Sequence, residues 1–317
     1  MHLEGAMRYQ MLSDLARRNG ELPPPPIGRR ATFDAFKEFY RYAVSVIRKP
    51  QDLHRLVHEV AEDAALSGAV WIEPQFNPTN YAPTLFPRPE DVLEFVLGAA
   101  AAAARRYQVG IGMMLAASRN RDPRHVTALA HLAVRYAGRG VVAFGLAGDE
   151  RAADAEQFIE AFAIARRAGL ICAPHAGEFA GVPKILAVLD ALVPDRIAHG
   201  VRAAESVALV ERLAGTPVTL DVSLHSNVRL GVVPSIGQHP LPILLDHGIR
   251  CTLGSDDPLL FGNDLLAEYL AARSALFLTD SQLAGIALTS ISASGAPPSL
   301  IEDSEARIAA WLSAVPA

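Results

Sequence analysis

Short apolar runs alternate with amphipathic stretches along most of this chain. The apolar runs are rich in valine, isoleucine, leucine and alanine and end at glycine, proline or polar residues, which is typical of buried strands. The series predicts seven strands, at Ala69–Glu73, Val109–Leu115, Val141–Ala147, Gly169–Ala173, Arg196–His199, Pro217–Ser223 and Ile249–Ser255.

The stretches between the strands repeat apolar positions every three or four residues, which predicts helices. These helices are expected at Met7–Asn19, Phe33–Val44, Gln51–Leu66, Asp91–Tyr107, Pro123–Ala137, Ala152–Ala168, Lys184–Leu192, Ser206–Leu213, Pro240–Asp246 and through most of 265–317. Alternation of strand and helix favours a parallel β/α architecture. With no repeat and no linker in view, residues 1–317 are expected to form one domain.

The expected fold is α/β, a TIM-type (β/α)8 barrel, which needs eight strands where the pattern gives seven. A gap between two neighbouring strands would leave backbone groups without partners inside the sheet. The missing strand would come at the start of the series, immediately before Met1. We therefore expect that strand one is absent or truncated in the sequence as it stands.

The composition narrows the range of partners. The formal net charge is −5, the pI is near 6.1 and there is no long basic run, so neither a nucleic-acid surface nor an anionic membrane is indicated. The alanine-rich stretch 98–104 is far shorter than the roughly 20 apolar residues of a membrane span. Cys172 and Cys251 lie inside apolar runs, so we expect buried free thiols. With no secretory signal visible, a cytoplasmic protein with a small-molecule substrate is expected.

Reactive side chains gather where the later apolar runs end. His175 and Glu178 follow one run, His199 closes the next, and Asp256 and Asp257 follow the last. In a TIM-type barrel the active site is built at the carboxyl ends of the strands. A histidine there can bind a metal and a carboxylate can move protons.

Five motifs in this order resemble the adenosine deaminase family of the amidohydrolase superfamily. They are His2-Leu-Glu-Gly5, His175-Ala-Gly-Glu178, His199-Gly200, Ser226-Asn227 and Ser255-Asp-Asp-Pro258. The resemblance runs nearly end to end. It implies one Zn²⁺ per chain, with His2, His175 and Asp256 as ligands. The family's other histidine ligand would fall two positions before His2, where the missing strand is also expected; the alternative is a natural chain with a weakened metal site.

The resemblance also implies the chemistry. Hydroxide formed at the zinc attacks C6 of a purine and ammonia leaves, with Glu178, His199 and Asp256 as the catalytic set. Glu178 would give a proton to N1, and His199 would orient the hydroxide and stabilise charge. The expected substrate contacts are Asp257 at N7, the backbone N–H of Gly148 at N3, Glu4 at the ribose, and His225 beside the site.

The substrate stays open between several 6-aminopurines. Glu4 stands where adenosine enzymes typically carry aspartate and adenine enzymes glutamate, whereas Gly5–Arg8 and Leu146–Glu150 look more like the nucleoside branch. Adenosine is preferred, with adenine or a modified nucleoside such as aminodeoxyfutalosine as alternatives. A catalytically silent purine-binding relative is the hypothesis from a different class. No H-x-E with P-C-x-x-C pair is present, which argues against nucleic-acid-editing deaminases.

Overall fold

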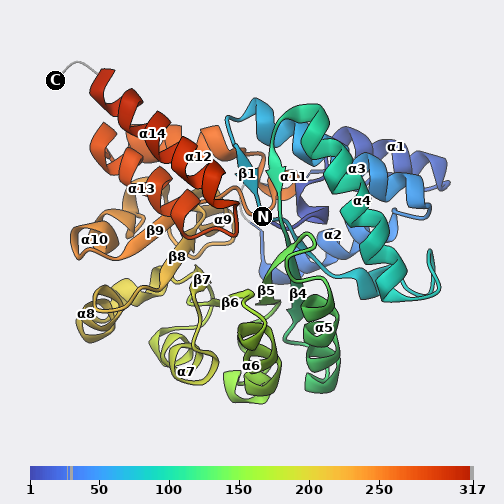
Figure 1. Cartoon of the computed structure of the whole chain (residues 1–317), viewed down its shortest axis with the longest axis horizontal. Coiled ribbons are helices and arrows are strands. Elements are labelled where there is room, and N and C mark those ends of the chain that lie inside the picture. The colour runs from blue at the N-terminus through green and yellow to red at the C-terminus, as the bar shows by residue number, and fades with distance from the viewer. Residues whose placement is uncertain (27, 29–30, 315–317) are drawn as a thin grey trace.

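A parallel sheet of seven strands lies at the centre of the molecule (Figure 1). The computed structural model describes residues 1–26, 28 and 31–314. Neighbouring strands in the sheet follow chain order: β2 (Gln75–Phe76), β4 (Met113–Ser118), β5 (Val141–Ala147), β6 (Ile171–Ala176), β7 (Arg196–His199), β8 (Thr219–Val222) and β9 (Arg250–Leu253).

The first two predicted strands are each divided. The predicted run Ala69–Glu73 contains only β1 (Trp71–Ile72), which pairs with β3 (Gly110–Ile111) in a separate two-stranded sheet. The run ends before Pro74, as predicted, but the chain forms a further strand, β2, directly after the proline, and this strand of the seven-stranded sheet was not predicted. Proline has no N–H to give to a neighbouring strand, but its carbonyl still accepts a hydrogen bond from Met114 at 3.1 Å.

Helices follow the strands and surround the sheet, as Figure 1 shows for the helices from α5 to α8. The α-helices are α1 (Tyr9–Arg18), α2 (Phe33–Ser45), α3 (Pro50–Leu66), α4 (Pro89–Tyr107), α5 (Pro123–Arg135), α6 (Ile159–Arg167), α7 (Val182–Leu192), α8 (Val207–Ala214), α9 (Leu224–Arg229), α10 (Leu241–Asp246), α11 (Pro258–Phe261), α12 (Leu265–Ala275), α13 (Asp280–Ser292) and α14 (Pro298–Ala314). The pattern missed only the short helices α9 and α11, which follow β8 and β9 directly and are too brief to show a helical period.

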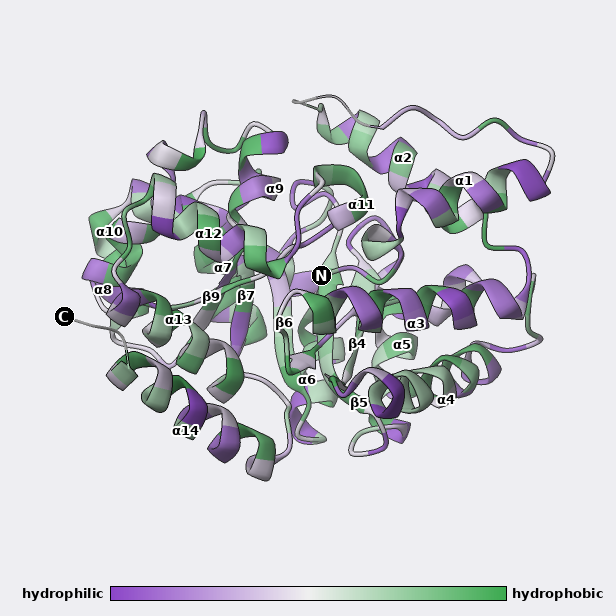
Figure 2. Ribbon diagram, turned by 90° about the horizontal axis from the view of Figure 1, so that it is seen from above, coloured by the Kyte–Doolittle hydropathy of each residue, from purple (hydrophilic) through white to green (hydrophobic). Residues whose placement is uncertain are grey.

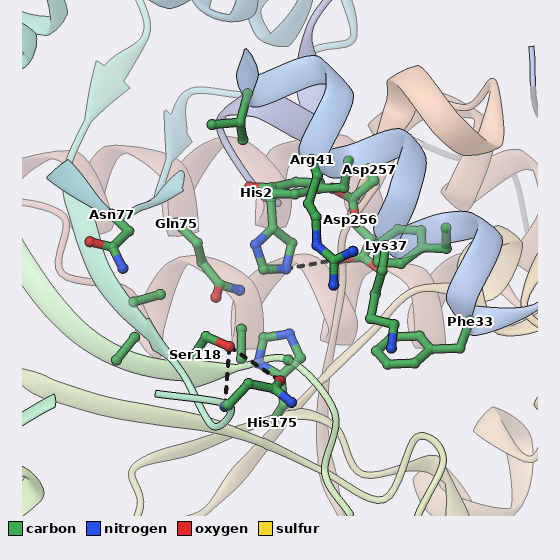
Figure 3. A pocket seen from close by; sticks show the side chains of 18 of the residues that line it. His2, Phe33, Lys37, Arg41, Gln75, Asn77, Ser118, His175, Asp256 and Asp257 are labelled. Carbon is green, nitrogen blue, oxygen red and sulfur yellow. Dashed lines mark hydrogen bonds and ion pairs between the residues drawn. The ribbon is translucent and has the colours of Figure 1, made fainter. Parts of the chain in front are cut away.

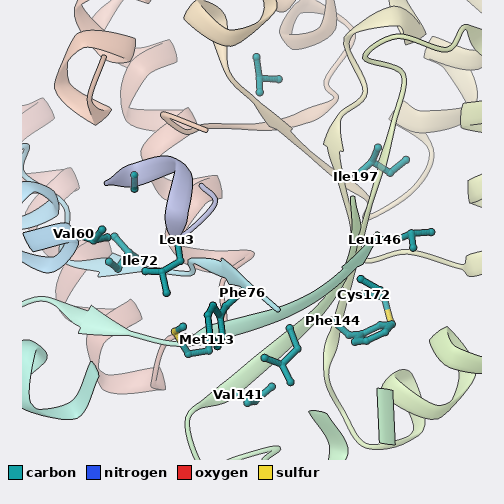
Figure 4. Close-up of a cluster of buried hydrophobic side chains, with 14 of the residues drawn as sticks. Leu3, Val60, Ile72, Phe76, Met113, Val141, Phe144, Leu146, Cys172 and Ile197 are labelled. Carbon is teal, nitrogen blue, oxygen red and sulfur yellow. The ribbon is translucent and has the colours of Figure 1, made fainter. Parts of the chain in front are cut away.

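The helices have two faces, and their apolar faces pack on the sheet. Figure 2 shows hydrophilic and hydrophobic positions alternating along α3, whose buried residues include Leu53, Leu56 and Val60. The strand β5 is buried at most positions because helices cover a parallel sheet from outside. In Figure 4 its residues Val141 and Phe144 lie among the core side chains. No helix among the described residues is long and apolar enough to cross a membrane.

The amino-terminal residues lie between the first and last strands of the sheet. The backbone of His2 forms a parallel bridge with Gln75 of β2, and its N–H donates to the carbonyl of Asp256, just after β9, at 3.0 Å. The Leu3 N–H donates to Gln75 on the β2 side. Residues 1–3 thus lie between the first and last strands of the sheet, although strand one was predicted to come before Met1. The ring centroid of His2 is 5.4 Å from that of His175 at the end of β6.

Candidate active site

A cavity of about 520 Å³ opens at the carboxyl ends of the strands (Figure 3). This is the size of an ordinary small-molecule site. His175, Glu178, His199, Asp256 and Asp257 all line it, together with His2. The side chains of Lys37 and Arg41 extend from α2 on another wall (Figure 3). The structure therefore gathers in one place the residues that the sequence pattern located at separate strand ends.

Two of these residues have strained backbones. His199 ends β7 with φ 71°, and Asp256 follows β9 with φ 57°. Residues other than glycine rarely adopt this left-handed conformation, and residues with such backbone strain are concentrated at functional sites. Gly177 and Gly200 also have positive φ, at 74° and 70°. These turns direct the side chains at the strand ends into the cavity instead of along the barrel wall.

The acidic and imidazole groups lie close together at the bottom of the cavity. His2 Nε2 is 3.7 Å from Asp256 Oδ1, and the ring centroids of His2 and His175 are 5.4 Å apart. His199 Nε2 is 3.6 Å from Glu178 Oε2. One oxygen or nitrogen each of Glu178, His199 and Asp256 lie within 4.8 Å of one another, as do those of His2, Asp256 and Asp257.

The pKa values of the three carboxyl groups are not shifted in the same direction. Burial, reinforced by the charges of Asp256, Glu150 and Asp257, raises the pKa of Glu178 well above its ordinary value. Burial would also raise the pKa of Asp256, but His199 and His2 lower it to about 2. Burial and the charge of Asp256 raise the pKa of Asp257. Glu178 thus keeps its proton to a higher pH than an ordinary glutamate, beside an Asp256 that is ionised at neutral pH.

The histidines are neutral and suit a metal. Burial is the main cause that lowers the pKa of His2 to about 4 and that of His175 well below its ordinary value. His175 Nδ1 is 3.1 Å from the carbonyl of Leu146, an outer contact typical of metal-binding histidines, which leaves Nε2 for the cavity. Two neutral imidazoles and the ionised Asp256 make a three-residue donor set, which is what catalytic zinc sites use. The donor types of these residues therefore fit a divalent metal, although the two groups whose donor atoms lie within 4.8 Å of one another do not include His175.

Asp257 has no partner for either carboxyl oxygen in the part of the chain that the structure describes, although its side chain is buried. A buried polar group without a hydrogen bond is costly and calls for an explanation. Asp257 lines the cavity, and Gly5 lies against it so closely that a Cβ there would be 1.5 Å from its Oδ1. The position of Asp257 suits a carboxyl group that forms its hydrogen bonds with a bound ligand.

Of the other three residues predicted to contact the substrate, only Gly148 lines the cavity directly. Glu4 is buried behind the wall, where its oxygens accept hydrogen bonds from the hydroxyls of Tyr40, at 3.0 Å, and Tyr81, at 2.9 Å. His225 Nδ1 lies 2.7 Å from Glu268 Oε1, and His225 is not one of the residues that line the cavity. Substrate contacts of Glu4, Gly148 and His225 stay predictions, and Glu4 reaches the cavity through Tyr40.

Sequence reasoning missed three buried charges that hold the site. The carboxylate of Glu150 accepts hydrogen bonds from backbone N–H groups of the loop that carries Glu178. Arg119 donates to the carbonyl of His175 at 2.6 Å. Glu268 accepts from the backbone of Leu224 after β8. Glu150 and Arg119 each follow a predicted strand end, and this position could have identified them as residues close to the site. Nothing near Glu268 in the sequence indicated its role.

Comparisons with known proteins identify one family. The family described as "Adenosine deaminase" matches residues 1–308. A "Putative adenosine/adenine deaminase" of Streptomyces virginiae is 43% identical, with 98% of this chain and 95% of that protein covered. An "Aminodeoxyfutalosine deaminase" of Acidothermus cellulolyticus is 37% identical over 86% of this chain and 81% of its own.

Solved structures share the fold. The adenine deaminase of Arthrobacter aurescens superposes with a TM-score of 0.89 at 26% identity and covers 99% of this chain and 98% of its own. An amidohydrolase of Burkholderia ambifaria, solved with bound Zn, has a TM-score of 0.86 at 22% identity over 98% of this chain and 88% of its own. These likenesses confirm the TIM-type barrel expected from the alternating pattern. The chain belongs to the adenosine deaminase family of hydrolytic purine deaminases.

Proposed function

We propose that this chain hydrolyses the exocyclic amino group of a 6-aminopurine, with adenosine converted to inosine and ammonia as the first candidate reaction. The observation that carries the proposal is the pairing of Glu178 with Asp256 and His199. It puts an acid whose pKa is raised beside an ionised carboxylate and an imidazole in one buried cluster. Deamination of this kind needs a proton donor for the ring and stabilisation of the attacking oxygen.

His2, His175 and Asp256 would hold one Zn²⁺. When bound there, zinc supplies water activation, because a catalytic zinc lowers the pKa of its water to about 7. The zinc-bound amidohydrolase among the structural neighbours supports this choice of metal. Asp256 is thus proposed both as a ligand and as a member of the catalytic set.

The other residues have roles in binding and proton transfer. Glu178 donates its proton to N1 of the purine, so that negative charge does not build up on the ring as C6 is attacked. His199 stabilises charge on the attacking oxygen. Asp257, whose oxygens have no hydrogen-bond partner among the described residues, binds the N7 side, and the backbone of Gly148 faces N3.

The wall of α2 favours a second candidate, a 6-aminopurine nucleoside that carries an anionic substituent. This wall presents the aromatic ring of Phe33 and the cations of Lys37 and Arg41, and Arg121 lines the cavity from the loop after β4. The acids that line the cavity belong to the cluster at its bottom. A carboxylate or phosphate near the mouth would meet these cations, and the aminodeoxyfutalosine deaminase among the relatives makes its named substrate the compound to test.

The test is an ultraviolet deamination assay on the whole chain loaded with one equivalent of zinc. Adenosine, adenine, aminodeoxyfutalosine and 5′-AMP are offered separately, and bound zinc is counted by mass spectrometry. Turnover of adenosine supports the first candidate. Turnover confined to the anionic nucleosides, with an increase in KM in Arg41→Gln, supports the second. A zinc-loaded chain that binds these purines but converts none contradicts both and favours the silent relative.

A further inference from the structure

A chain of buried hydrogen bonds runs from the start of α10 to the active-site imidazole. The backbone N–H of Leu241 donates to His239 Nδ1 at 3.1 Å. His239 Nε2 is 3.0 Å from Asn227 Oδ1, and Asn227 Nδ2 is 3.5 Å from His199 Nδ1. His199, Asn227 and His239 are 3%, 0% and 3% exposed, so water does not compete for these contacts.

The direction of every proton in this chain follows from its first bond. A backbone N–H can only donate, so His239 Nδ1 must accept. Burial lowers the pKa of His239 to about 3, so its ring is neutral and carries its hydrogen on Nε2. Asn227 Oδ1 accepts that hydrogen, and its amide group then turns its NH₂ toward His199. The NH₂ group can only donate, so His199 Nδ1 must accept.

We infer that Asn227 and His239 are positioning residues that hold His199 in the tautomer with its hydrogen on Nε2. This inference rests on the proposed function for its catalytic meaning. Nε2 is the ring atom on the cavity side, 3.6 Å from Glu178 Oε2. His199 therefore presents a hydrogen-bond donor to the reacting centre, which suits stabilisation of an oxygen that gains negative charge. The opposite tautomer would present a lone pair there.

The same two residues also support the local fold, so the test must separate the two roles. The carbonyl of Asn227 accepts the N–H groups of Val232 and Val233 after α9, and these bonds use its backbone alone. Asn227→Asp keeps the backbone, the size and the acceptor for His239. It changes the group that faces His199 from a donor to an acceptor and, when the new carboxyl group is ionised, adds a negative charge there, and both changes favour a proton on His199 Nδ1.

The decisive measurement is nitrogen NMR of the protein labelled with ¹⁵N-histidine, with His199→Gln used to assign the signals. We expect the wild type to carry hydrogen on His199 Nε2 and not on Nδ1, and Asn227→Asp to place a proton on Nδ1. A proton on Nδ1 in the wild type, or an unchanged His199 in Asn227→Asp, overturns the inference. This readout does not depend on turnover, so it stands even if the proposed reaction fails.

Kinetics supply the second arm on whichever purine the wild type deaminates. Asn227→Asp should lower kcat by at least about tenfold, the usual loss when an outer hydrogen-bond partner is removed, with little change in KM. His239→Gln, whose amide can still donate to Asn227, should retain more activity than His239→Leu. His247→Gln is the matched control, because His247 is exposed at the end of α10 and should change neither kcat nor the His199 signals. Equal losses in His239→Gln and His239→Leu would contradict the positioning role.

Discussion

The carboxylate of Glu150 fixes the backbone of Glu178, the proposed proton donor. Its Oε1 accepts the N–H of Glu178 at 2.9 Å, and its Oε2 accepts those of Gly177 and Ala180 at 2.9 and 3.1 Å. Glu150 is 1% exposed, so these bonds are protected from water. The loop after β6 is therefore shaped by a side chain at the end of β5, and the same negative charge contributes to the raised pKa of Glu178.

Glu150→Ala should lower both stability and turnover. Three backbone N–H groups would lose their acceptor, and a buried donor left unsatisfied costs about 1–3 kcal/mol. We expect a loss of at least that size in urea unfolding and a fall in kcat. Glu156→Gln, an exposed change in the segment before α6, is the control and should stay within about 0.5 kcal/mol of wild type. Wild-type kcat in Glu150→Ala would show that the loop keeps its shape without the carboxylate.

Glu178→Gln should be inactive yet more stable than wild type at high pH. The pKa of Glu178 is raised in the folded protein, so above its unfolded pKa the folded state must retain a proton that the unfolded chain gives up. The fold therefore loses stability as pH rises toward the folded pKa, and a neutral glutamine removes this loss. We expect the stability gain to be small at pH 5 and larger at pH 8 in chelator-treated protein.

For the same variant, kcat should fall by at least about 100-fold, the lower end of the usual contribution from general acid catalysis. Glu302→Gln on the exposed side of α14 is the control for the stability series, because its carboxylate is solvated in both states. A stability difference that does not grow between pH 5 and pH 8 would mean that Glu178 is ionised in the folded protein.

Gly5→Ala should disturb Asp257 and weaken substrate binding. A Cβ on Gly5 would lie 1.5 Å from Asp257 Oδ1 and 2.5 Å from its Cγ, so one of the two residues must move. We expect KM to rise more than kcat falls, and stability to decrease by about 1–3 kcal/mol, as overpacking usually costs. Gly98→Ala in α4 meets nothing within 4 Å and should stabilise the helix by about 0.5–1 kcal/mol. An unchanged KM in Gly5→Ala would argue against a role for Asp257 in binding.

The sequence predicted those site residues that stand at the ends of strands. His175, His199 and Asp256 each stand at or just after the end of an apolar run, and parallel strands bring such ends together. The alternation of strand and helix predicted most elements to within a few residues. The split at Pro74 was not predicted, because the apolar pattern alone does not show that a strand can resume after a proline.

The supporting residues were not predictable in the same way. Glu150 accepts from backbone N–H groups that lie 27 to 30 residues after it in the chain. Glu268 accepts from backbone N–H groups that lie 43 to 44 residues before it. Those partners are present in every residue except proline, so no side-chain pattern identifies them. His239 gave no metal or catalytic pattern in the sequence, because its partners are a backbone N–H and the amide of Asn227.

A largely buried charge network lies beneath the active site and should contribute to the stability of this part of the barrel. Arg196 of β7 forms ion pairs with Glu73 at 2.7 Å and Asp221 at 3.2 Å, although the angles at Arg196 Nε and Glu73 Oε2 fall outside hydrogen-bond geometry. All three residues line a second cavity of about 160 Å³, which His175 also borders. The arginine thus compensates two carboxylates inside the barrel.

Arg196→Met should cost about 3–5 kcal/mol in urea unfolding, the usual loss when one partner of a buried ion pair is removed and its opposite charge stays behind. Arg212→Met, which breaks the exposed pair with Asp190, should cost no more than about 1 kcal/mol. The triple variant with Glu73→Gln and Asp221→Asn should recover part of the stability lost in Arg196→Met, because no unpaired charge remains. If the triple variant is as unstable as Arg196→Met, the loss comes from packing of the arginine side chain and not from uncompensated charge.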